Sequence, residues 1–236
     1  MKKTVVIIAI TALILYVLTS ILLANKMHPI EKELEKRLPQ WIGPAKKYTV
    51  KIKDTNFMDI LTGNIKDLYL MAEDVAPPGS PVLENVKVHL YNVSFDMDKI
   101  KKIGKADFII TAGEEAINKY KDENLKEYPD LAVELKKDKI LVSTNKKVMG
   151  FNLPVKVSGI LEAEDSKKIN FQCASITVSG IPLPSFVRDT LEKEINPLVD
   201  LTEIQIVTNI LYIKILDRKL QVEGNAHLDA PIYFDK

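Results

Sequence analysis

The chain has 236 residues, of which 46% are hydrophobic and 28% are charged, and its formal net charge is +1. This composition is typical of a folded protein, and it excludes a long disordered chain and a strongly basic nucleic-acid-binding protein. Cys173 is the only cysteine, which excludes an intrachain disulfide and a cysteine metal cluster. Because Cys173 lies in a strand-like run, we expect a buried, unreactive thiol.

The N-terminal segment begins with two lysines and continues as an uncharged run from Thr4 to Ala24. As a helix this run would be about 31 Å long, the thickness of a bilayer's hydrocarbon core. Ala24 suits a signal-peptidase site, but Leu22 is too large for the other small-residue position. We therefore expect a transmembrane signal-anchor over residues 1–25, with the domain outside the cytoplasm at the cell membrane. The alternative is a cleaved signal peptide and a secreted protein.

Residues 26–45 are predicted to form a juxtamembrane amphipathic segment. Ile30, Leu34 and Leu38 recur every four residues among charged ones, and Trp41 follows. Such a helix either lies in the membrane interface or packs on its own domain, and the pattern leaves both interpretations open.

Most of the domain over residues 46–236 is predicted to be β-structure, because apolar residues alternate with polar ones or form short runs between turn signals. The predicted strands are Lys47–Lys53, Ile65–Ala72, Val82–Asn92, Ala106–Thr111, Leu131–Leu135, Ile140–Thr144, Leu153–Leu161, Ile169–Val178, Glu203–Val207, Ile210–Leu216 and Leu220–Leu228. The apolar parity changes between Phe171 and Ile176, which indicates a β-bulge.

Two short internal helices are predicted before the middle of the chain. Asn56–Thr62 reads as one or two helical turns closed by Gly63. Glu114–Tyr128 is a longer helix that ends before Pro129, because proline disfavours the helical conformation of the residue before it.

A third internal helix is predicted between two proline-rich boundaries. It begins at about Ser185, which we expect to be the N-cap, and Pro197 ends it. Val187, Leu191 and Ile195 recur every fourth residue on its apolar side. A helix this short is marginal alone, so it must lie on apolar neighbours, most simply the flanking strands.

These elements predict an α+β domain built on a long antiparallel sheet, preceded by the transmembrane helix. A strand, a helix and a returning strand occur at Ala106 to Leu135 and again at Ile169 to Ile206. Two such units would suit a curved sheet that wraps around two or three helices.

Catalytic motifs are absent from the sequence: it has no Gly-x-Ser-x-Gly elbow, Walker loop, Gly-x-Gly-x-x-Gly or His-Glu-x-x-His. His28, His89 and His227 lack metal-ligand spacing, and the last two fall on polar sides of predicted strands, where we expect them to be solvated. We therefore expect no enzyme, no metal or other cofactor, and no nucleic-acid partner.

Three patterns between about Thr49 and Leu228 resemble the LmeA-type phospholipid-binding family. They are Leu61-Thr62-Gly63, the strand-to-helix unit from Phe108 to Tyr120, and the helical element from Leu183 to Leu198. The resemblance implies an elongated antiparallel sheet wrapped around helices, as in tubular lipid-binding folds, with an apolar cavity for acyl chains. It also implies an exported protein of the bacterial cell envelope.

The resemblance favours a membrane-anchored, extracytoplasmic protein that holds or transfers phospholipid or another acyl-chain lipid. The alternative is a structural envelope protein with a solid core that binds an unknown protein partner. On the first hypothesis, side chains from the strands and helices line the cavity. The candidates are Leu68, Leu70, Ile117, Tyr120, Phe186, Val187, Leu191 and Ile195.

Overall fold

The computed structural model describes residues 28–40, 42–96, 99–148, 150–202, 207–228 and 232–233. The predicted transmembrane segment, Trp41 and most of the predicted strand Glu203–Val207 lie outside these residues. Within the part that is described, no helix is long and apolar enough to cross a membrane.

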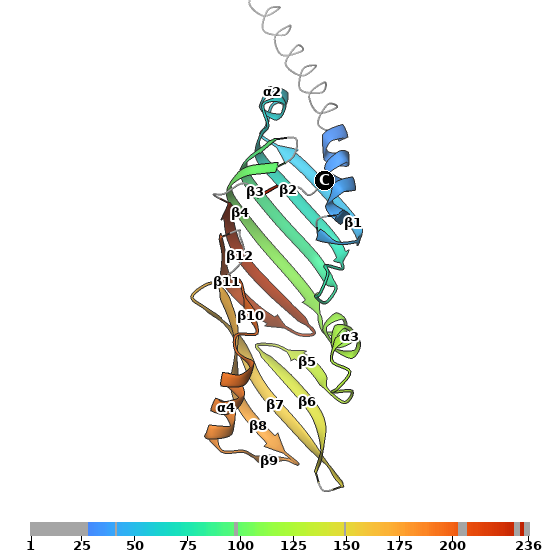
Figure 1. Ribbon diagram of the computed structural model, residues 1–236, viewed down its shortest axis with the longest axis vertical. Coiled ribbons are helices and arrows are strands. Elements are labelled where there is room, and N and C mark those ends of the chain that lie inside the picture. The colour runs from blue at the N-terminus through green and yellow to red at the C-terminus, as the bar shows by residue number, and fades with distance from the viewer. Residues whose placement is uncertain are drawn as a thin grey trace, which may run out of the picture.

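Figure 1 shows an elongated molecule in which two antiparallel sheets follow each other along the long axis. The first sheet has the strand order β1-β2-β3-β4-β12-β11, with β13 paired to β4, and the second has the order β10-β8-β7-β6-β5, with β9 paired to β8. The strands of the first sheet are β1 (Ala45–Lys53), β2 (Asn64–Val75), β3 (Leu83–Asp96), β4 (Lys99–Gly113), β11 (Val207–Leu216), β12 (Lys219–Leu228) and β13 (Ile232–Tyr233). Those of the second are β5 (Ala132–Lys136), β6 (Lys139–Val148), β7 (Phe151–Glu164), β8 (Lys168–Val178), β9 (Ile181–Pro182) and β10 (Val199–Asp200).

Strand β12 divides the expected single long sheet into two. It pairs with β4 from Lys219 opposite Gly113 to Leu228 opposite Ile103. β12, from the end of the chain, thus occupies the edge of β4 that lies opposite β3. β5 therefore begins a new sheet. The α+β class and the antiparallel pairing are confirmed.

The two sheets meet at β11, whose outer edge is closed by turns of the second sheet. The N–H of Ile210 donates to the carbonyl of Ser166, and the N–H of Asp138 donates to the carbonyl of Ile215, at 2.6 and 2.8 Å. The free edge of the first sheet is therefore covered at this end, which suppresses edge-to-edge aggregation.

The helices are α2 (Phe57–Leu61), α3 (Glu114–Asn124), α4 (Ser185–Ile195) and a helix over residues 28–40, drawn blue in Figure 1. The turn predicted over Asn56–Thr62 is confirmed, with Asn56 as its N-cap. α3 ends at Asn124, earlier than the predicted Tyr128, and Leu125 has left the helical conformation with φ −112° and ψ 54°.

Helix α4 starts with Ser185 as its first helical residue, so the prediction that Ser185 is the N-cap is wrong. Pro184 takes that position, because its φ of −60° and ψ of 157° give the extended backbone that an N-cap needs. The predicted bulge is confirmed: Ser158 pairs with Ser175 but Gly159 pairs with Cys173, which leaves Ala174 extra.

Helices α3 and α4 dock on strand edges through the same pair of side chains, a glutamate followed four residues later by an asparagine. In α4, the Glu192 carboxylate accepts from the N–H of Cys173 at 2.6 Å. The Asn196 amide bonds both the N–H and the carbonyl of Phe171, at 2.7 and 2.9 Å. Both bonded residues lie on β8, whose outer edge in this stretch pairs with no strand among the residues that the structure describes.

Helix α3 repeats this arrangement on β5. The Glu114 carboxylate accepts from the N–H of Leu135 at 2.6 Å, and the Asn118 amide bonds the N–H and the carbonyl of Val133 at 2.9 and 2.7 Å. The helices of the two expected strand-helix-strand units thus share one set of docking bonds, although α3 docks on the strand that follows it and α4 on the strand that precedes it.

The helix over residues 28–40 also lies along a strand edge. Its Glu31 and Glu35 carboxylates accept from the N–H groups of Ile52 and Val50 on β1, each at 2.8 Å. Leu38 is only 5% exposed in the core of the first sheet. Of the two interpretations left open by the sequence, this helix fits the one in which it packs on its own domain.

Candidate functional site

The register of the strands sorts the side chains of the first sheet onto two faces. Leu70, Val88, Phe108 and Gly224 are direct neighbours across β2, β3, β4 and β12, so they share one face. The residues on either side of them in each strand point to the opposite face. We call the face that carries Leu70, Val88 and Phe108 the apolar face.

The second sheet has an equivalent apolar face. Val142, Val157 and Ile176 are direct neighbours across β6, β7 and β8. Ile215 and Leu220, at the ends of β11 and β12, pack into the core of this second sheet. The two apolar faces are therefore continuous where the sheets meet.

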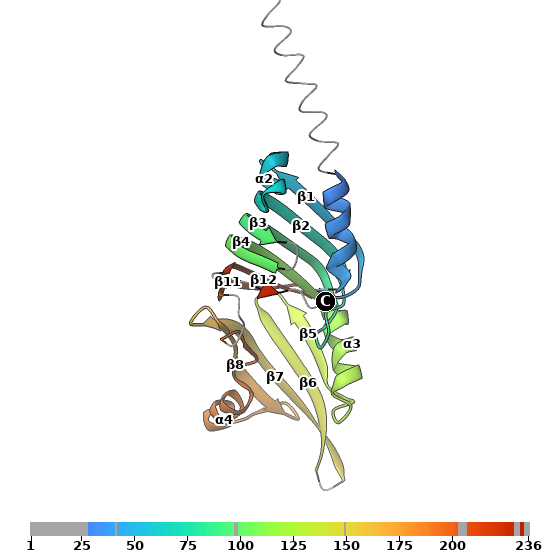
Figure 2. The same ribbon diagram turned by 45° about the horizontal axis from the view of Figure 1, so that its top comes forward.

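The centre of the second apolar face remains partly exposed. Val142, Val155 and Val157 lie on the central strands β6 and β7, yet they are only partly buried. Figures 1 and 2 show α3 and α4 at opposite edges of this sheet, α3 beside β5 and α4 beside β8. Because their glutamates and asparagines bond the edge strands β5 and β8, these helices do not lie across the middle.

The first sheet also has partly exposed apolar side chains away from the helix over residues 28–40. Val88, Phe108, Ile110 and Val222 are partly buried, whereas Leu70, closer to that helix, is 8% exposed. Contiguous apolar surface of this kind is typical of ligand-binding or interaction sites.

The candidate cavity residues from the sequence do not meet in one place. Leu68 and Leu70 are both 8% exposed in the core of the first sheet. Four others are partly buried and pack against the core of the second sheet, from α3 and α4. These four are Ile117, Val187, Leu191 and Ile195.

Two further candidates point elsewhere. The Tyr120 hydroxyl donates to the carbonyl of Gly79, in the loop between β2 and β3, at 2.9 Å. Phe186 is 66% exposed in the first turn of α4. A lipid-binding role for the eight candidates remains a prediction.

Val142, Val155 and Val157 were not among the cavity residues predicted from the sequence. Their alternation predicts one apolar side for each strand, but the same pattern occurs in strands covered by a solid core. These three valines differ from residues under a solid core because α3 and α4 lie at the edges of the second sheet and leave its centre partly exposed. The Glu-x-x-x-Asn spacing at Glu114 and Glu192 is the signal that could have indicated this.

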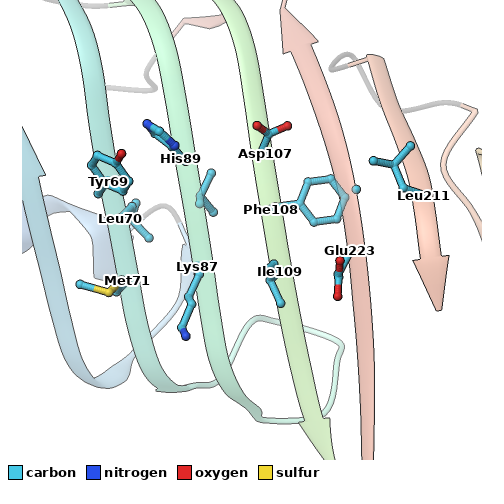
Figure 3. Close-up of a pocket in the computed structure, with 12 residues that line it drawn as sticks. Tyr69, Leu70, Met71, Lys87, His89, Asp107, Phe108, Ile109, Leu211 and Glu223 are labelled. Carbon is cyan, nitrogen blue, oxygen red and sulfur yellow. The ribbon is translucent and has the colours of Figure 1, made fainter. Parts of the chain in front are cut away.

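A pocket of about 420 Å³ lies on the face opposite to the apolar one, and Figure 3 shows its lining. Side chains from β2, β3, β4 and β12 form its two walls, while the backbone of the row from Leu70 to Gly224 forms its floor. The Glu223 carboxylate in one wall accepts from Lys214 and Gln221, each at 2.6 Å. The bond from Lys214 is the main cause that lowers the pKa of Glu223.

His89, in the other wall of this pocket, is not solvated as expected. Its ring stacks on Tyr69 with centroids 3.8 Å apart and lies 3.9 Å from the ring of Tyr91. It also pairs with Asp67, and its side chain is 21% exposed. Alternation correctly predicts the polar face, but it cannot show that Tyr69 on the neighbouring strand and Tyr91 on the same strand cover the ring.

Cys173 is buried as predicted, with 6% of its surface exposed. Burial, followed by the neighbouring Glu192 carboxylate, raises the pKa of its thiol. Within the described ranges, no group of three or more His, Cys, Asp and Glu side chains is placed to hold a metal ion.

Comparison with known proteins gives one result for the chain. A family model described as LmeA-like phospholipid-binding matches residues 28–225, which include the second sheet, the first sheet except the end of β12 and β13, and the helices that dock on them. No curated protein and no solved structure matches.

Proposed function

The chain belongs to the LmeA-like phospholipid-binding family, which implies phospholipid binding, and from this we propose that phospholipid acyl chains lie on the apolar face. The lipid covers the centre of the second sheet, between α3 and α4. Lipid on this surface takes the place of the helix or strand that would cover it in an ordinary two-layer domain.

The observation that supports this proposal is the partial exposure of Val142, Val155 and Val157 on central strands. Burial of apolar surface is favourable by about 25 cal/mol per Å², so an acyl chain gains affinity from each of these valines that it covers. The pocket on the opposite face is a weaker candidate, because charged residues such as Lys87, Asp107 and Glu223 stand in its walls.

We further propose that the protein works at the outer side of the cytoplasmic membrane of a bacterial envelope, where it holds or passes on phospholipid. The support is the apolar run from Thr4 to Ala24, its preceding lysines and its poor cleavage site. The N-terminal segment acts as an anchor, and the domain that follows carries the lipid.

The test compares two positions on the same strand. Val157 lies on the apolar face, and Ile160 lies on the opposite face and is also partly buried. Full-length Val157→Gln and Ile160→Gln variants are purified in one detergent, and the phospholipid that co-purifies is quantified by mass spectrometry. We expect Val157→Gln to lose phospholipid and Ile160→Gln to keep the wild-type amount.

Because both variants retain the N-terminal segment, lipid that adheres to that segment cancels in the comparison. Equal phospholipid in the two variants would contradict the proposal. Wild-type protein without phospholipid would favour the alternative of a solid core and a protein partner.

A further inference from the structure

The second sheet ends in a cluster of exposed apolar side chains. Phe151, Ile181 and Phe186 are 73%, 68% and 66% exposed. They belong to the start of β7, to β9 and to the first turn of α4. In Figure 1 the β6–β7 hairpin and β9 lie at the end of the molecule away from the helix over residues 28–40. We call these three residues the distal tip.

Two segments of the second sheet that reach the distal tip carry only basic charges, although Asp189 follows Phe186 by three residues in α4. The chain as a whole has 33 basic and 32 acidic residues, but no Asp or Glu occurs between residues 140 and 161 or between residues 169 and 188. The charged residues in these two segments are Lys146, Lys147, Lys156 and Arg188. Lys147 and Lys146 pair with Asn152 and Leu153, the two residues that follow Phe151, so Lys146 lies on the same face as Phe151 and Lys147 on the opposite face.

The apolar face extends to the distal tip. Alternation along β7 places Phe151, Leu153, Val155 and Val157 on one side of the strand. Leu183, between β9 and α4, packs against the core of the second sheet. Apolar side chains therefore follow one side of β7 from the exposed end of the molecule to the centre of the apolar face.

We propose that the distal tip docks on the surface of an anionic phospholipid bilayer and that lipid enters or leaves the apolar face there. Aromatic and aliphatic side chains flanked by lysines suit the boundary between headgroups and acyl chains, and the lysines attract anionic headgroups. This inference rests on the proposed phospholipid binding. The helix over residues 28–40 lies at the end of the domain opposite to the distal tip (Figure 1). If the N-terminal segment is anchored as proposed, the tip therefore docks on a second bilayer.

The experiment uses the full-length protein reconstituted into lipid nanodiscs, so that the N-terminal segment is already occupied. Nanodiscs are mixed with vesicles of phosphatidylcholine and phosphatidylglycerol, and protein that floats with the vesicles is measured. We expect the variant Phe151→Ser, Ile181→Ser, Phe186→Ser to lose vesicle capture by at least about tenfold. The double variant Lys146→Glu, Lys147→Glu is expected to have a similar effect. Vesicles of phosphatidylcholine alone are expected to capture little wild-type protein.

The control is Tyr212→Ser, because Tyr212 is 60% exposed on β11, away from the tip. It is expected to capture vesicles as the wild type does. The substituted tip side chains are exposed, and equal thermal melting curves verify that each variant is folded. Wild-type protein that captures no anionic vesicles, or tip variants that capture them as well as Tyr212→Ser does, would overturn the inference.

Phospholipid that co-purifies with each protein separates this inference from the proposed function. A tip variant that retains bound phospholipid but loses vesicle capture supports docking at the tip. Wild-type protein that carries phospholipid but captures no vesicles overturns the tip alone. Wild-type protein without phospholipid overturns the proposed function, and lipid passage at the tip with it.

Discussion

Asn118, near the start of α3, and Asn196, the C-cap of α4, make the same two bonds, and each satisfies both the N–H and the carbonyl of one edge-strand residue. Removal of such a side chain leaves a donor and an acceptor without a partner at a partly buried edge. The cost of one unsatisfied buried group is about 1–3 kcal/mol. These two residues therefore decide whether α3 and α4 stay at the edges of the second sheet.

We predict that Asn196→Ala lowers the free energy of unfolding by about 1–3 kcal/mol, because Phe171 loses both of its backbone bonds to α4. Urea denaturation followed by circular dichroism measures the change. Asn124→Ala is the matched control, because Asn124 is exposed and bonds only a carbonyl of its own helix. An equal loss in both variants would contradict the role assigned to Asn196.

A second prediction concerns Cys173, whose pKa burial raises above its ordinary value of 9.0. A raised pKa means that the folded protein holds the thiol proton more tightly than the unfolded chain does. This contribution to stability is complete below the unfolded pKa, and it is lost as the pH rises towards the folded pKa.

We therefore expect the native thiol to react with a soluble disulfide reagent at neutral pH far more slowly than the thiol of the denatured protein. Absorbance of the released thiolate measures both rates. Rapid reaction of the native protein would show that Cys173 is accessible, contrary to its position beneath α4.

The elements themselves follow largely from hydrophobic period and turn chemistry. The longer strands, the bulge between Phe171 and Ile176, and the end of α4 before Pro197 are readable from local sequence, whereas the two-residue strands β9, β10 and β13 were not predicted. The division into two sheets is not, because it depends on β12, which pairs with β4 across more than a hundred residues of chain. Local patterns carry no information about which of two distant strands occupies an edge.

The candidate site was predictable only in part, for a related reason. The four-residue spacing of Val187, Leu191 and Ile195 correctly predicts the side of α4 that meets the sheet. Whether the strands beneath remain exposed depends on where the helix axis lies. The bonds from Glu192 and Asn196 to β8 fix that axis at the sheet edge.

We predict that Leu191→Trp lowers the amount of bound phospholipid without a lower melting temperature. Leu191 is only partly buried beside the apolar face, so a larger ring extends over the surface that lipid covers. In a close-packed core the same change would cost about 1–3 kcal/mol. Leu191→Asp is the companion variant. It is also expected to keep the melting temperature, since a carboxylate at a partly exposed position can hydrate.

Thr190→Trp provides the control, because Thr190 is exposed on the other side of α4. Mass spectrometry and thermal melting are applied to all three variants. If Leu191→Trp destabilises the domain and leaves bound phospholipid unchanged, α4 does not border the lipid.

At the scale of the whole molecule, the two sheets form one elongated body with a continuous apolar face, an N-terminal helix at one end and the distal tip at the other. Helices or turns cover the edges at β1, β5, β8 and β11, so the partly exposed surface that remains lies on the faces. A long, open apolar face suits the binding of extended apolar ligands better than a compact, enclosed pocket does.

The anchor proposed for the N-terminal segment gives a prediction at the same scale. Full-length protein is expected to stay in the membrane pellet after an alkaline carbonate wash, because the run from Thr4 to Ala24 is long enough to span a bilayer. Its C-terminus is expected to be open to added protease in cells stripped of their wall. Recovery of a soluble form that begins near Asn25 would contradict the anchor.

The most direct measurement for the central claim maps where acyl chains touch the protein. A phospholipid with a photoreactive group at the end of one acyl chain is incorporated into nanodiscs with the full-length protein, irradiated, and located by peptide mass spectrometry. We predict cross-links at Val142, Val155 and Val157 on the apolar face, and loss of those cross-links in Val157→Gln. Cross-links confined to the N-terminal segment, or equally frequent around Ile160 on the opposite face, would contradict the claim that this face holds phospholipid.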